Sequence, residues 1–299
     1  MGKILKLIEI TDKPWEQRWK AFSETCSAEC GVSIIAEIKT ATKENFSEIL
    51  GEVLVSDADI FCVSDLFSVE VLAKVKQTTH QATMAGACDF FIKEKGGWWP
   101  RVILMEAFSR TVSLNIGLLD LDASALIVGG TGTAKLIVGA LTKIGFRKIN
   151  IALESEAEGN ALIAEMRKQY YQIKFEFIPF QTITTLPGVH SLVVNTTPLT
   201  IENALLDELY FFNFLKAGGV VVDVNLIPTV TPLIEESKIW GARHLSGDYI
   251  SAQSDAYLLS QILDKKIDIE KYRTQLRANA DAVPFDINPF LKRFRDRGT

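Results

Sequence analysis

Short apolar runs alternate with amphipathic segments along most of the chain. In the first hundred residues this pattern predicts three strands, each followed by a helix. The strands are expected at 3–10, 33–38 and 59–63, and the helices at 15–26, 43–53 and 69–75, with Ser68 as the N-cap of the third helix. A hairpin-like excursion at 86–91 and 96–99 and a helix at 101–110 follow. The alternation is typical of a parallel or mixed sheet.

The second half repeats this alternation more regularly. Its strands are predicted at 125–128, 148–153, 174–178, 191–195, 220–224 and 243–245. The helices between them are predicted to end near 144 and to cover 158–169, 205–214 and 232–241, with Gly218 and Gly219 closing the second of these three. From 251 onward the chain is expected to be helical, with a tail from 265 to 299. Apolar strands separated by helices imply a parallel sheet covered on both faces.

A glycine-rich turn joins a predicted strand to a predicted helix in Ala125-Leu-Ile-Val-Gly-Gly-Thr-Gly-Thr-Ala-Lys135. Its glycines permit a tight turn and close approach of the backbone to a pyrophosphate. The free N–H groups at the start of the next helix can hold a phosphate. The turn therefore predicts a dinucleotide site in the middle of the chain. Its candidate cofactor-binding residues are Gly129, Gly130, Thr131, Gly132, Thr133 and Ala134.

Two other strand ends carry residues suited to such a site. Glu154 follows the next strand, where a carboxylate would accept hydrogen bonds from the adenosine ribose and would repel a 2′-phosphate. A solvated glutamate at a helix start is the alternative interpretation. Asn195, Thr196 and Thr197 end a buried strand and would face the cofactor, although ordinary turn chemistry before a helix favours the same residue types.

Four motifs, in order, resemble those of the shikimate dehydrogenase family. The glycine turn resembles the family's Gly-Ala-Gly-Gly-Ala turn, and Asn195-Thr-Thr-Pro-Leu199 resembles its Asn-Ala-Thr-Pro stretch. Asp223-Val-Asn-Leu-Ile-Pro-Thr-Val-Thr-Pro-Leu233 is similar to Asp-x-x-Tyr-x-Pro-x-x-Thr-Pro-Leu. Trp240-Gly-Ala-Arg-His-Leu-Ser-Gly-Asp-Tyr-Ile-Ser-Ala-Gln253 is similar to the run that closes the family's site. The resemblance is strongest from 125 to 260.

This resemblance implies an α/β fold of two domains. A substrate-type domain would comprise 1–110 and 248–299, with the C-terminal helices returning to it. A Rossmann-like domain with a doubly wound parallel sheet would comprise 111–247. The resemblance also implies that Gly247 contacts the cofactor and that Ser68, Asp89 and Gln253 contact the substrate.

The first domain matches the family in register but departs from it at the reactive positions. Phe61-Cys-Val-Ser-Asp-Leu-Phe-Ser68 stands where the family has Phe-Asn-Val-Thr-x-Pro-x-Lys, so Ser68 replaces the catalytic lysine. Leu104 replaces the catalytic aspartate, and Leu226 replaces the tyrosine beside the nicotinamide. The Ser-x-Ser that holds the substrate carboxylate has no counterpart near 11–14, and Thr131 stands where the turn's second glycine belongs.

Hydride transfer at a secondary alcohol needs a group that takes up or delivers the hydroxyl proton. Because Ser68 and Leu104 replace the two catalytic residues of the family, no catalytic residue is assigned. Four titratable residues near the replaced positions are candidates for that role, and each is equally well explained as a solvated helix residue. They are Asp65, Lys74, Lys76 and Glu106.

Composition restricts the class of protein, its expected location and its expected partners. The 299 residues are 47% hydrophobic and 23% charged, as in a globular protein, and the net charge of −5 indicates no nucleic-acid partner. No apolar run approaches the roughly 20 residues that cross a bilayer, so we expect a cytoplasmic location and no membrane partner. The four cysteines are expected to be reduced thiols, without a metal site: Cys26, Cys30, Cys62 and Cys88.

Two functions from different classes are consistent with these observations. The first is an NAD(P)-dependent oxidoreductase of the shikimate dehydrogenase superfamily that acts on a small substrate other than shikimate. The second is a non-catalytic relative that binds a nucleotide or metabolite as a sensor or partner subunit. A reductase related to glutamyl-tRNA reductase or methylene-tetrahydrofolate dehydrogenase ranks last, because no cysteine stands where a thioester nucleophile would be needed. NAD is expected to bind better than NADP because of Glu154. The sequence makes no prediction of the oligomeric state.

Overall fold

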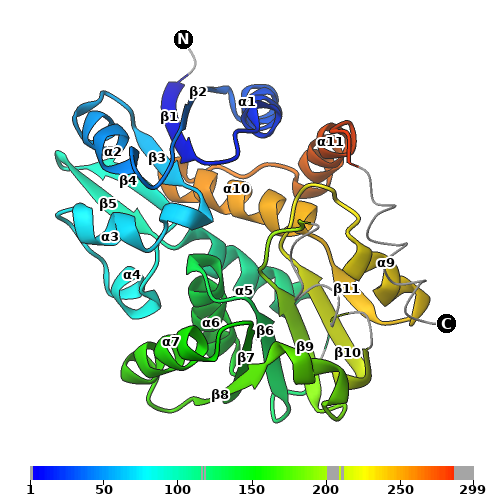
Figure 1. Cartoon of the computed structure of the whole chain (residues 1–299). Coiled ribbons are helices and arrows are strands. Elements are labelled where there is room, and N and C mark those ends of the chain that lie inside the picture. Colours follow the sequence, from blue (N-terminus) through cyan, green and yellow to red (C-terminus); the bar gives the residue numbers. More distant parts are fainter. Residues whose placement is uncertain (1–2, 116, 118, 201–208, 210–211, 286–299) are drawn as a thin grey trace. The chain divides into compact units, whose positions relative to one another are not determined.

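The computed structural model describes residues 3–115, 117, 119–200, 209 and 212–285 (Figure 1). Its contacts divide the chain into two compact units. The first unit comprises Met1–Phe108, Thr131–Leu136 and Ala252–Asn279, and the second comprises Ser109–Gly130, Ile137–Ser251 and Ala280–Thr299. Each unit contains one sheet, so the predicted α/β fold is confirmed.

The sheet of the first unit is mixed, in the order β2-β1-β3-β4-β5. Its strands are β1 (Lys3–Thr11), β2 (Val32–Thr40), β3 (Ile60–Val63), β4 (Phe90–Glu94) and β5 (Gly97–Arg101). The strands β2, β1 and β3 run parallel, whereas β4 and β5 form an antiparallel hairpin. The predicted hairpin and the predicted mixed or parallel sheet are therefore confirmed.

Helices from both ends of the chain belong to this unit. They are α1 (Glu16–Cys30), α2 (Phe46–Val55), α3 (Glu70–Lys74), α4 (His80–Ala85), the first half of α5 (Ile103–Asn115), most of α10 (Gly247–Leu263) and most of α11 (Ile269–Asp281). Trp19 and Phe22 lie on one face of α1, because residues three apart share a helix face. Phe22 packs against Tyr272 of α11 with ring centroids 5.6 Å apart. The C-terminal helices thus return to the first unit, as expected.

The sheet of the second unit is parallel throughout, in the order β11-β10-β9-β6-β7-β8. Its strands are β6 (Ser124–Val128), β7 (Lys148–Leu153), β8 (Lys174–Pro179), β9 (His190–Asn195), β10 (Leu215–Asp223) and β11 (Arg243–Leu245). Counted from β6, this is the 3-2-1-4-5-6 order of the doubly wound dinucleotide-binding fold. All of β6 and β9 is buried, as their apolar sequences predict.

Helices α6 (Gly132–Ile144), α7 (Glu156–Gln169) and α9 (Pro232–Ile239) follow strands of this sheet. The start of α9 shows how the sequence sets a boundary. Thr231 is its N-cap and accepts a hydrogen bond from the N–H of Ile234 at 3.3 Å, and Pro232 occupies the first turn. The predicted helix at 205–214 lies largely outside the described residues.

Three local predictions were wrong or incomplete. Ser68 does not cap a helix, because a 3-10 turn, η1 (Asp65–Phe67), precedes it and its Oγ donates to the Asp65 carbonyl at 2.7 Å. Gly218 and Gly219 lie inside β10, where the pairing with β9 shifts between Leu215 and Val220. Gly218 has φ +76°, which favours glycine, so the pair marks a strand irregularity and not a helix end. Helix α4 was not predicted.

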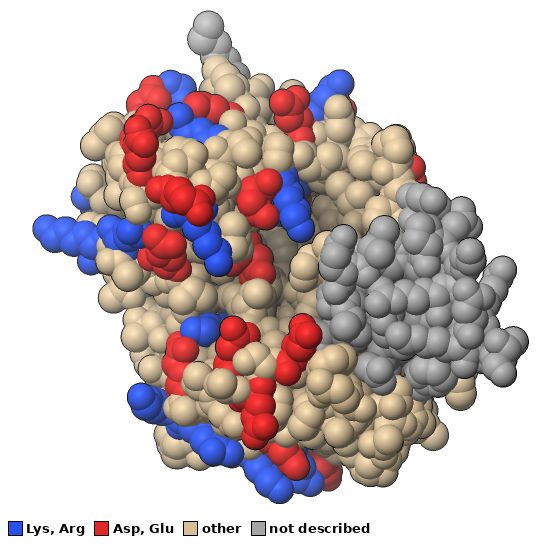
Figure 2. Space-filling view, in the orientation of Figure 1, with Lys and Arg blue, Asp and Glu red and all other residues tan. Residues whose placement is uncertain are grey.

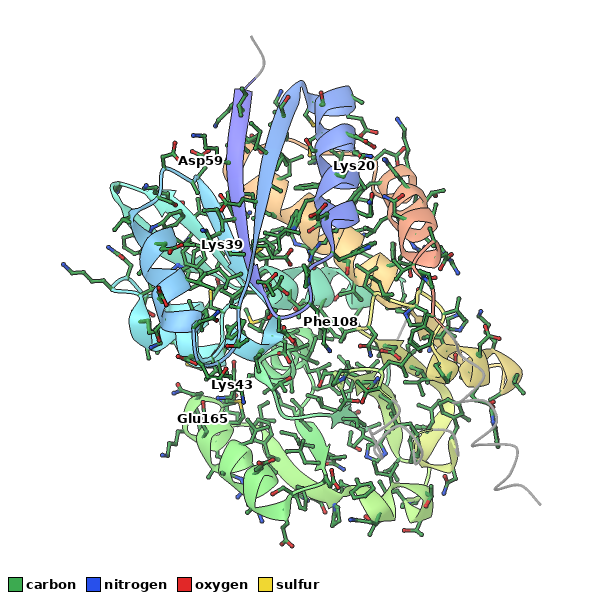
Figure 3. All side chains as sticks on the ribbon, turned by 45° about the horizontal axis from the view of Figure 1, so that its top comes forward. Lys20, Lys39, Lys43, Asp59, Phe108 and Glu165 are labelled. Atoms are coloured by element: carbon green, nitrogen blue, oxygen red, sulfur yellow. The ribbon has the colours of Figure 1, made fainter. Side chains whose placement is uncertain are left out.

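Acidic and basic side chains are interspersed on the face of the molecule that Figure 2 shows. Several of them form exposed ion pairs, such as Lys39 with Glu37 and Glu52 (Lys39 is labelled in Figure 3). Such pairs contribute little to stability. Within the described ranges, no helix is long and apolar enough to cross a membrane.

Candidate functional site

The glycine turn and the Asn195 segment follow neighbouring strands of the second unit. Val128 at the end of β6 pairs with Asn195 at the end of β9. The strand order reverses between these two strands, because β7 and β8 lie beyond β6 and β10 and β11 lie beyond β9. In open parallel sheets, ligands bind at the carboxyl ends of the strands at this point. The fold therefore brings together two of the three segments that were selected from the sequence.

Gly129 is required by the geometry of this point. Its φ is +116°, and a Cβ built there would lie 2.3 Å from Thr196 Oγ1. Thr196 is held by two hydrogen bonds to the Val128 carbonyl, from its N–H at 2.9 Å and from its Oγ1 at 2.8 Å. At the next residue, Gly130, an added Cβ would lie 2.7 Å from a methyl carbon of Leu153 at the end of β7, so that flexible side chain would have to shift. Gly129 is therefore the position that has no room for a side chain.

Helix α6 begins directly after these glycines. The N–H of Lys135 donates to the Thr131 carbonyl at 3.2 Å, so the N–H groups of the residues before Lys135 lie in the first turn, where a helix offers them no acceptor. One of them already has a partner elsewhere, because the N–H of Thr133 donates to Asp65 Oδ1 at 2.5 Å. Gly132 lies against Ser68, whose Oγ would be 1.7 Å from an added Cβ.

A buried hydrogen-bond network organises the ends of β9 and β10. Asp223, at the end of β10, accepts from Thr231 Oγ1 at 2.6 Å and from Asn225 Nδ2 at 2.7 Å. Asn195 donates to the same carboxylate at 3.3 Å, and its Oδ1 accepts from the N–H and the hydroxyl of Thr197. Burial raises the pKa of Asp223, and these hydrogen bonds oppose the rise. The side chains of Asn195 and Thr197 are thus held in fixed positions at the sheet edge.

Sequence reasoning did not assign this role to Asp223, although the residue opens one of the four motifs. The network also reaches Gly247, at the start of α10. A Cβ at Gly247 would lie 2.1 Å from the carbonyl oxygen of Asn225, so only glycine fits there. The signal in the sequence was the glycine itself, in the run from Trp240 to Gln253.

Glu154 directly follows β7, the strand next to β6, and its side chain is exposed. The following residue, Ser155, is the N-cap of α7 and accepts a hydrogen bond from the N–H of Glu158 at 3.3 Å. Capping is therefore done by Ser155, and Glu154 stands at the carboxyl end of the strand. This is the position from which a carboxylate reads a ribose in doubly wound folds. Its role in this chain stays a prediction.

In the first unit, Asp89 caps a helix. Its two carboxylate oxygens accept hydrogen bonds from the N–H groups of Ile103 at 2.8 Å and Leu104 at 2.6 Å, at the start of α5. Burial raises the pKa of Asp89 to about 6, and the two N–H groups oppose the rise. Ser68 is buried, and Gln253 is half-buried on α10. Their predicted contacts with a substrate stay predictions.

The raised pKa of Asp89 predicts a pH-dependent stability. The folded protein retains a proton at Asp89 between the ordinary pKa of 3.8 and about 6, where the unfolded chain has released it. The free energy of unfolding should therefore fall as pH rises through this window, by about 3 kcal/mol. Asp89→Asn should lack this fall when the free energy of unfolding by urea is measured between pH 4 and pH 7. Parallel pH profiles of the two proteins would contradict the assignment.

The four titratable residues near the replaced catalytic positions have different surroundings. Lys74 is exposed and bonds Ser47 Oγ at 2.8 Å and Glu70 at 3.3 Å, and Lys76 is exposed. Glu106 is buried and accepts from Gln81 at 3.0 Å. Asp65 is half-buried and accepts the N–H of Thr133 at the start of α6. The two lysines thus fit the interpretation as solvated residues, whereas Glu106 and Asp65 do not.

A buried ionic cluster in the first unit was not found from the sequence. Arg18 of α1 donates to both carboxylate oxygens of Asp255 on α10, at 2.7 and 3.1 Å, and Tyr272 donates to the same carboxylate at 2.8 Å. Glu9 lies beside the cluster and accepts from Trp19 Nε1 at 2.7 Å. Burial raises the pKa of Glu9, and Arg18 lowers it. A single arginine on an amphipathic helix gives no signal that it will be buried.

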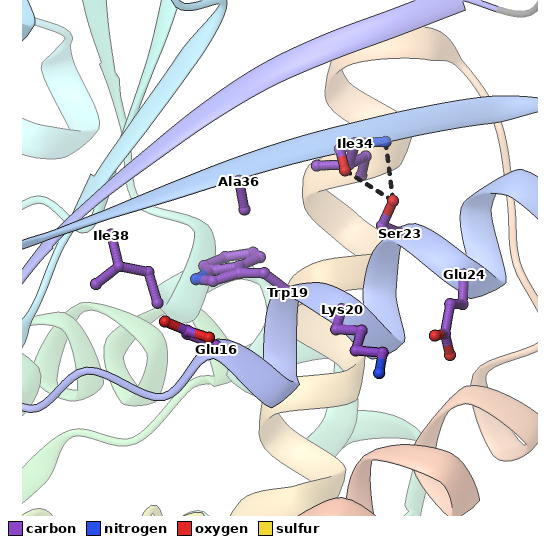
Figure 4. A pocket seen from close by; sticks show the side chains of 8 residues that line it. All are labelled: Glu16, Trp19, Lys20, Ser23, Glu24, Ile34, Ala36 and Ile38. Carbon is purple, nitrogen blue, oxygen red and sulfur yellow. Dashed lines mark hydrogen bonds between the residues drawn. The ribbon is translucent and has the colours of Figure 1, made fainter.

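The first unit also has a groove of about 370 Å³ between α1 and β2 (Figure 4). Ser23 fastens the helix to the strand, because its Oγ donates to the Ile34 carbonyl at 2.7 Å and accepts from the Ile34 N–H at 3.1 Å. The groove is lined by Glu16, Trp19, Lys20, Ser23, Glu24, Ile34, Ala36 and Ile38. None of the predicted cofactor-binding or substrate-binding residues is among them.

Comparison with known proteins finds shikimate dehydrogenases that are similar to part of this chain in sequence. No family model matches the chain. It is 26% identical over 154 residues to a shikimate dehydrogenase (NADP(+)) of Geobacter sulfurreducens, covering 50% of this chain and 54% of the relative. It is 26% identical over 199 residues to that of Citrifermentans bemidjiense, covering 66% and 68%. The chain thus spans between about half and two thirds of the curated relatives that it matches.

The fold matches over nearly the whole chain. The quinate dehydrogenase of Corynebacterium glutamicum in complex with NAD has a TM-score of 0.77 at 16% identity, covering 93% of this chain and 100% of that one. The shikimate 5-dehydrogenase of Thermus thermophilus in complex with NADP(H) and shikimate has a TM-score of 0.72 at 17% identity, covering 92% and 99%. The chain thus has the fold of the shikimate and quinate dehydrogenases and resembles shikimate dehydrogenases in part of its sequence. The two structures hold different dinucleotides, so these likenesses do not decide between NAD and NADP.

Proposed function

We propose that the chain is an NAD(P)-dependent oxidoreductase that transfers a hydride to or from a small substrate other than shikimate. The observation that carries the proposal is the turn at Gly129, which lies where the strand order reverses and is followed by a helix start. Gly129 has no room for a side chain and Gly130 carries none, so backbone atoms form the surface of the turn there. Close approach of the backbone to a pyrophosphate is the use that dinucleotide-binding folds make of such a turn.

The proposed residues follow from this placement. The pyrophosphate would lie on the turn from Gly129 to Ala134, with Asn195, Thr196, Thr197 and Gly247 at the neighbouring strand ends and Glu154 on the adenosine ribose. In this proposal 111–247 is the dinucleotide domain, and 1–110 with 248–299 is the substrate domain. Ser68, Asp89 and Gln253 would contact the substrate.

A substrate other than shikimate is proposed because of the replaced positions. A serine hydroxyl is a weak acid and base, and Ser68 Oγ already donates to the Asp65 carbonyl. Leu104 does not titrate, and its N–H binds Asp89. A structural relative with a different substrate supports the proposal: the 5-ketofructose reductase of a Gluconobacter strain has a TM-score of 0.73 at 15% identity, covering 92% of this chain and 99% of that one.

The same replacements favour a second candidate function, a non-catalytic relative that binds a nucleotide or metabolite. Hydride transfer distinguishes the two. An oxidoreductase reduces NAD with some member of a panel of small polyols and hydroxy acids, whereas a binding protein shows a saturable dinucleotide complex and no reduction with any of them.

The cofactor preference gives a direct test. We expect wild-type protein to bind NAD at least about tenfold more tightly than NADP, because a charged hydrogen bond to a ribose hydroxyl contributes on the order of 1.5–3 kcal/mol and a 2′-phosphate would be repelled. Glu154→Ala should bring the two dissociation constants, measured by isothermal titration calorimetry, close together. Glu156→Ala is the matched control, since Glu156 lies in the first turn of α7 and is also exposed. Tighter binding of NADP by the wild-type protein would contradict the assignment of Glu154.

A further inference from the structure

The start of α6 is already in contact with a carboxylate. Asp65 Oδ1 accepts the N–H of Thr133 at 2.5 Å, in the first turn of the helix. In the same place Ser68 Oγ lies against the backbone of Gly132, close enough that any side chain at Gly132 would overlap it. All four residues belong to the first unit. One hydrogen bond and one close approach thus place the segment from Asp65 to Ser68 beside this turn.

The position taken by Asp65 is the one that suits a bound anion. The first N–H groups of a helix have no acceptor within the helix, and they carry a partial positive charge. A phosphate binds at helix starts for this reason, and so does a carboxylate side chain. A single N–H group donates one good hydrogen bond, so a phosphate oxygen and Asp65 cannot both receive that of Thr133.

We propose that Asp65 determines the affinity of this chain for its dinucleotide, because its carboxylate competes with the pyrophosphate for the N–H groups at the start of α6. The inference rests on the proposed function, since it concerns the same turn. Binding of a dinucleotide then requires Asp65 to give up its hydrogen bond to Thr133. The loss of that bond and the repulsion between carboxylate and phosphate both weaken the complex.

The sequence of the segment is consistent with this role. Cys62-Val-Ser-Asp-Leu-Phe-Ser68 stands where the related motif reads Asn-Val-Thr-x-Pro-x-Lys, so a positive charge is absent at Ser68 and a negative charge is present at Asp65. Both features make the surroundings of the helix start less favourable for an anion. The backbone of Gly132 fills the space beyond Ser68 Oγ, so a longer side chain at position 68 could not extend in that direction.

Asp65→Asn tests the inference, because asparagine keeps the size and a hydrogen-bond acceptor but loses the charge. We expect the dissociation constant for NAD, measured by calorimetry at low ionic strength, to fall by on the order of tenfold. Adenosine, which has no phosphate, should bind both proteins equally. Glu70→Gln is the matched control: it removes one negative charge five residues further along, from a side chain that pairs with Lys74, and should leave NAD affinity unchanged.

The possible results separate this inference from the proposed function. If wild-type protein and Asp65→Asn bind NAD equally tightly, the proposed function stands and the inference is wrong. If neither binds a dinucleotide, the proposed function fails, and the carboxylate is not what limits binding. Weaker binding by Asp65→Asn would mean that Asp65 assists the cofactor and would also overturn the inference. Should Asp65→Asn fold poorly, Asp65→Ser offers another neutral acceptor for the same measurement.

Discussion

Gly129→Ala is expected to destabilise the protein by about 3 kcal/mol and to abolish dinucleotide binding. A φ of +116° is a strained backbone conformation for alanine, at a cost of order 1–3 kcal/mol. The added methyl group would also lie 2.3 Å from Thr196 Oγ1, and Thr196 cannot move away without losing its two hydrogen bonds to Val128. Urea unfolding followed by circular dichroism measures the loss of stability, and calorimetry with NAD measures binding.

Gly241→Ala is the control for a positive φ without crowding, at a smaller angle than that of Gly129. Gly241 also has a positive φ, of +66°, and nothing lies within 4 Å of an added Cβ. It should lose only about 1 kcal/mol, the left-handed penalty alone, and keep NAD affinity. If both variants lose the same free energy of unfolding, crowding against Thr196 is not the reason that position 129 requires glycine.

The sequence predicted the second unit better than the first, and the reason is physical. Strands such as β6 and β7 are buried on both faces, so they read as unbroken apolar runs, and the predicted 148–153 coincides with β7. Helix ends were less well predicted. The first helix was expected to end at Cys26 but continues to Cys30, where Gly31 takes a left-handed conformation with φ +65°.

Errors arose where a local pattern had two meanings. The Gly218-Gly219 pair is typical of a helix end. The backbone freedom of glycine also accommodates an irregularity in strand pairing, and this is its role in β10. Ser68 has the residue type of an N-cap, yet its hydroxyl binds the Asp65 carbonyl because η1 places that group within reach. Residue type alone does not distinguish these outcomes.

The sequence predicted which segments form the candidate site, but not the contacts that these segments make with residues far away in the chain. The glycine turn and the Asn195 segment could be chosen from their residues, and their position at one sheet edge follows from the strand order. Contacts between distant residues could not be predicted in this way. Asp65 and Thr133 are 68 residues apart, and Arg18 and Asp255 are 237 residues apart. Nothing in the local sequence of either partner indicates the other.

Arg18→Met is expected to destabilise the first unit by about 3–5 kcal/mol. Its guanidinium donates two hydrogen bonds to Asp255, whose side chain is completely buried. Burial lowers the pKa of Arg18, but Asp255 and Glu9 raise it by more, so the arginine stays charged. Methionine would fill the space and leave the carboxylate without a counter-charge, which is the most costly way to break a buried ion pair. Urea unfolding followed by circular dichroism measures the loss.

Two further variants show whether the cost comes from the unpaired charge. Arg18→Met combined with Asp255→Leu removes both charges and should recover most of the stability, since an apolar pair of similar volume often replaces a buried ion pair without loss. Tyr272→Phe removes only the third hydrogen bond to Asp255 and should cost about 1 kcal/mol. If the double variant is as unstable as Arg18→Met, packing of the arginine side chain between α1 and α10 is what matters, and the ion pair contributes little.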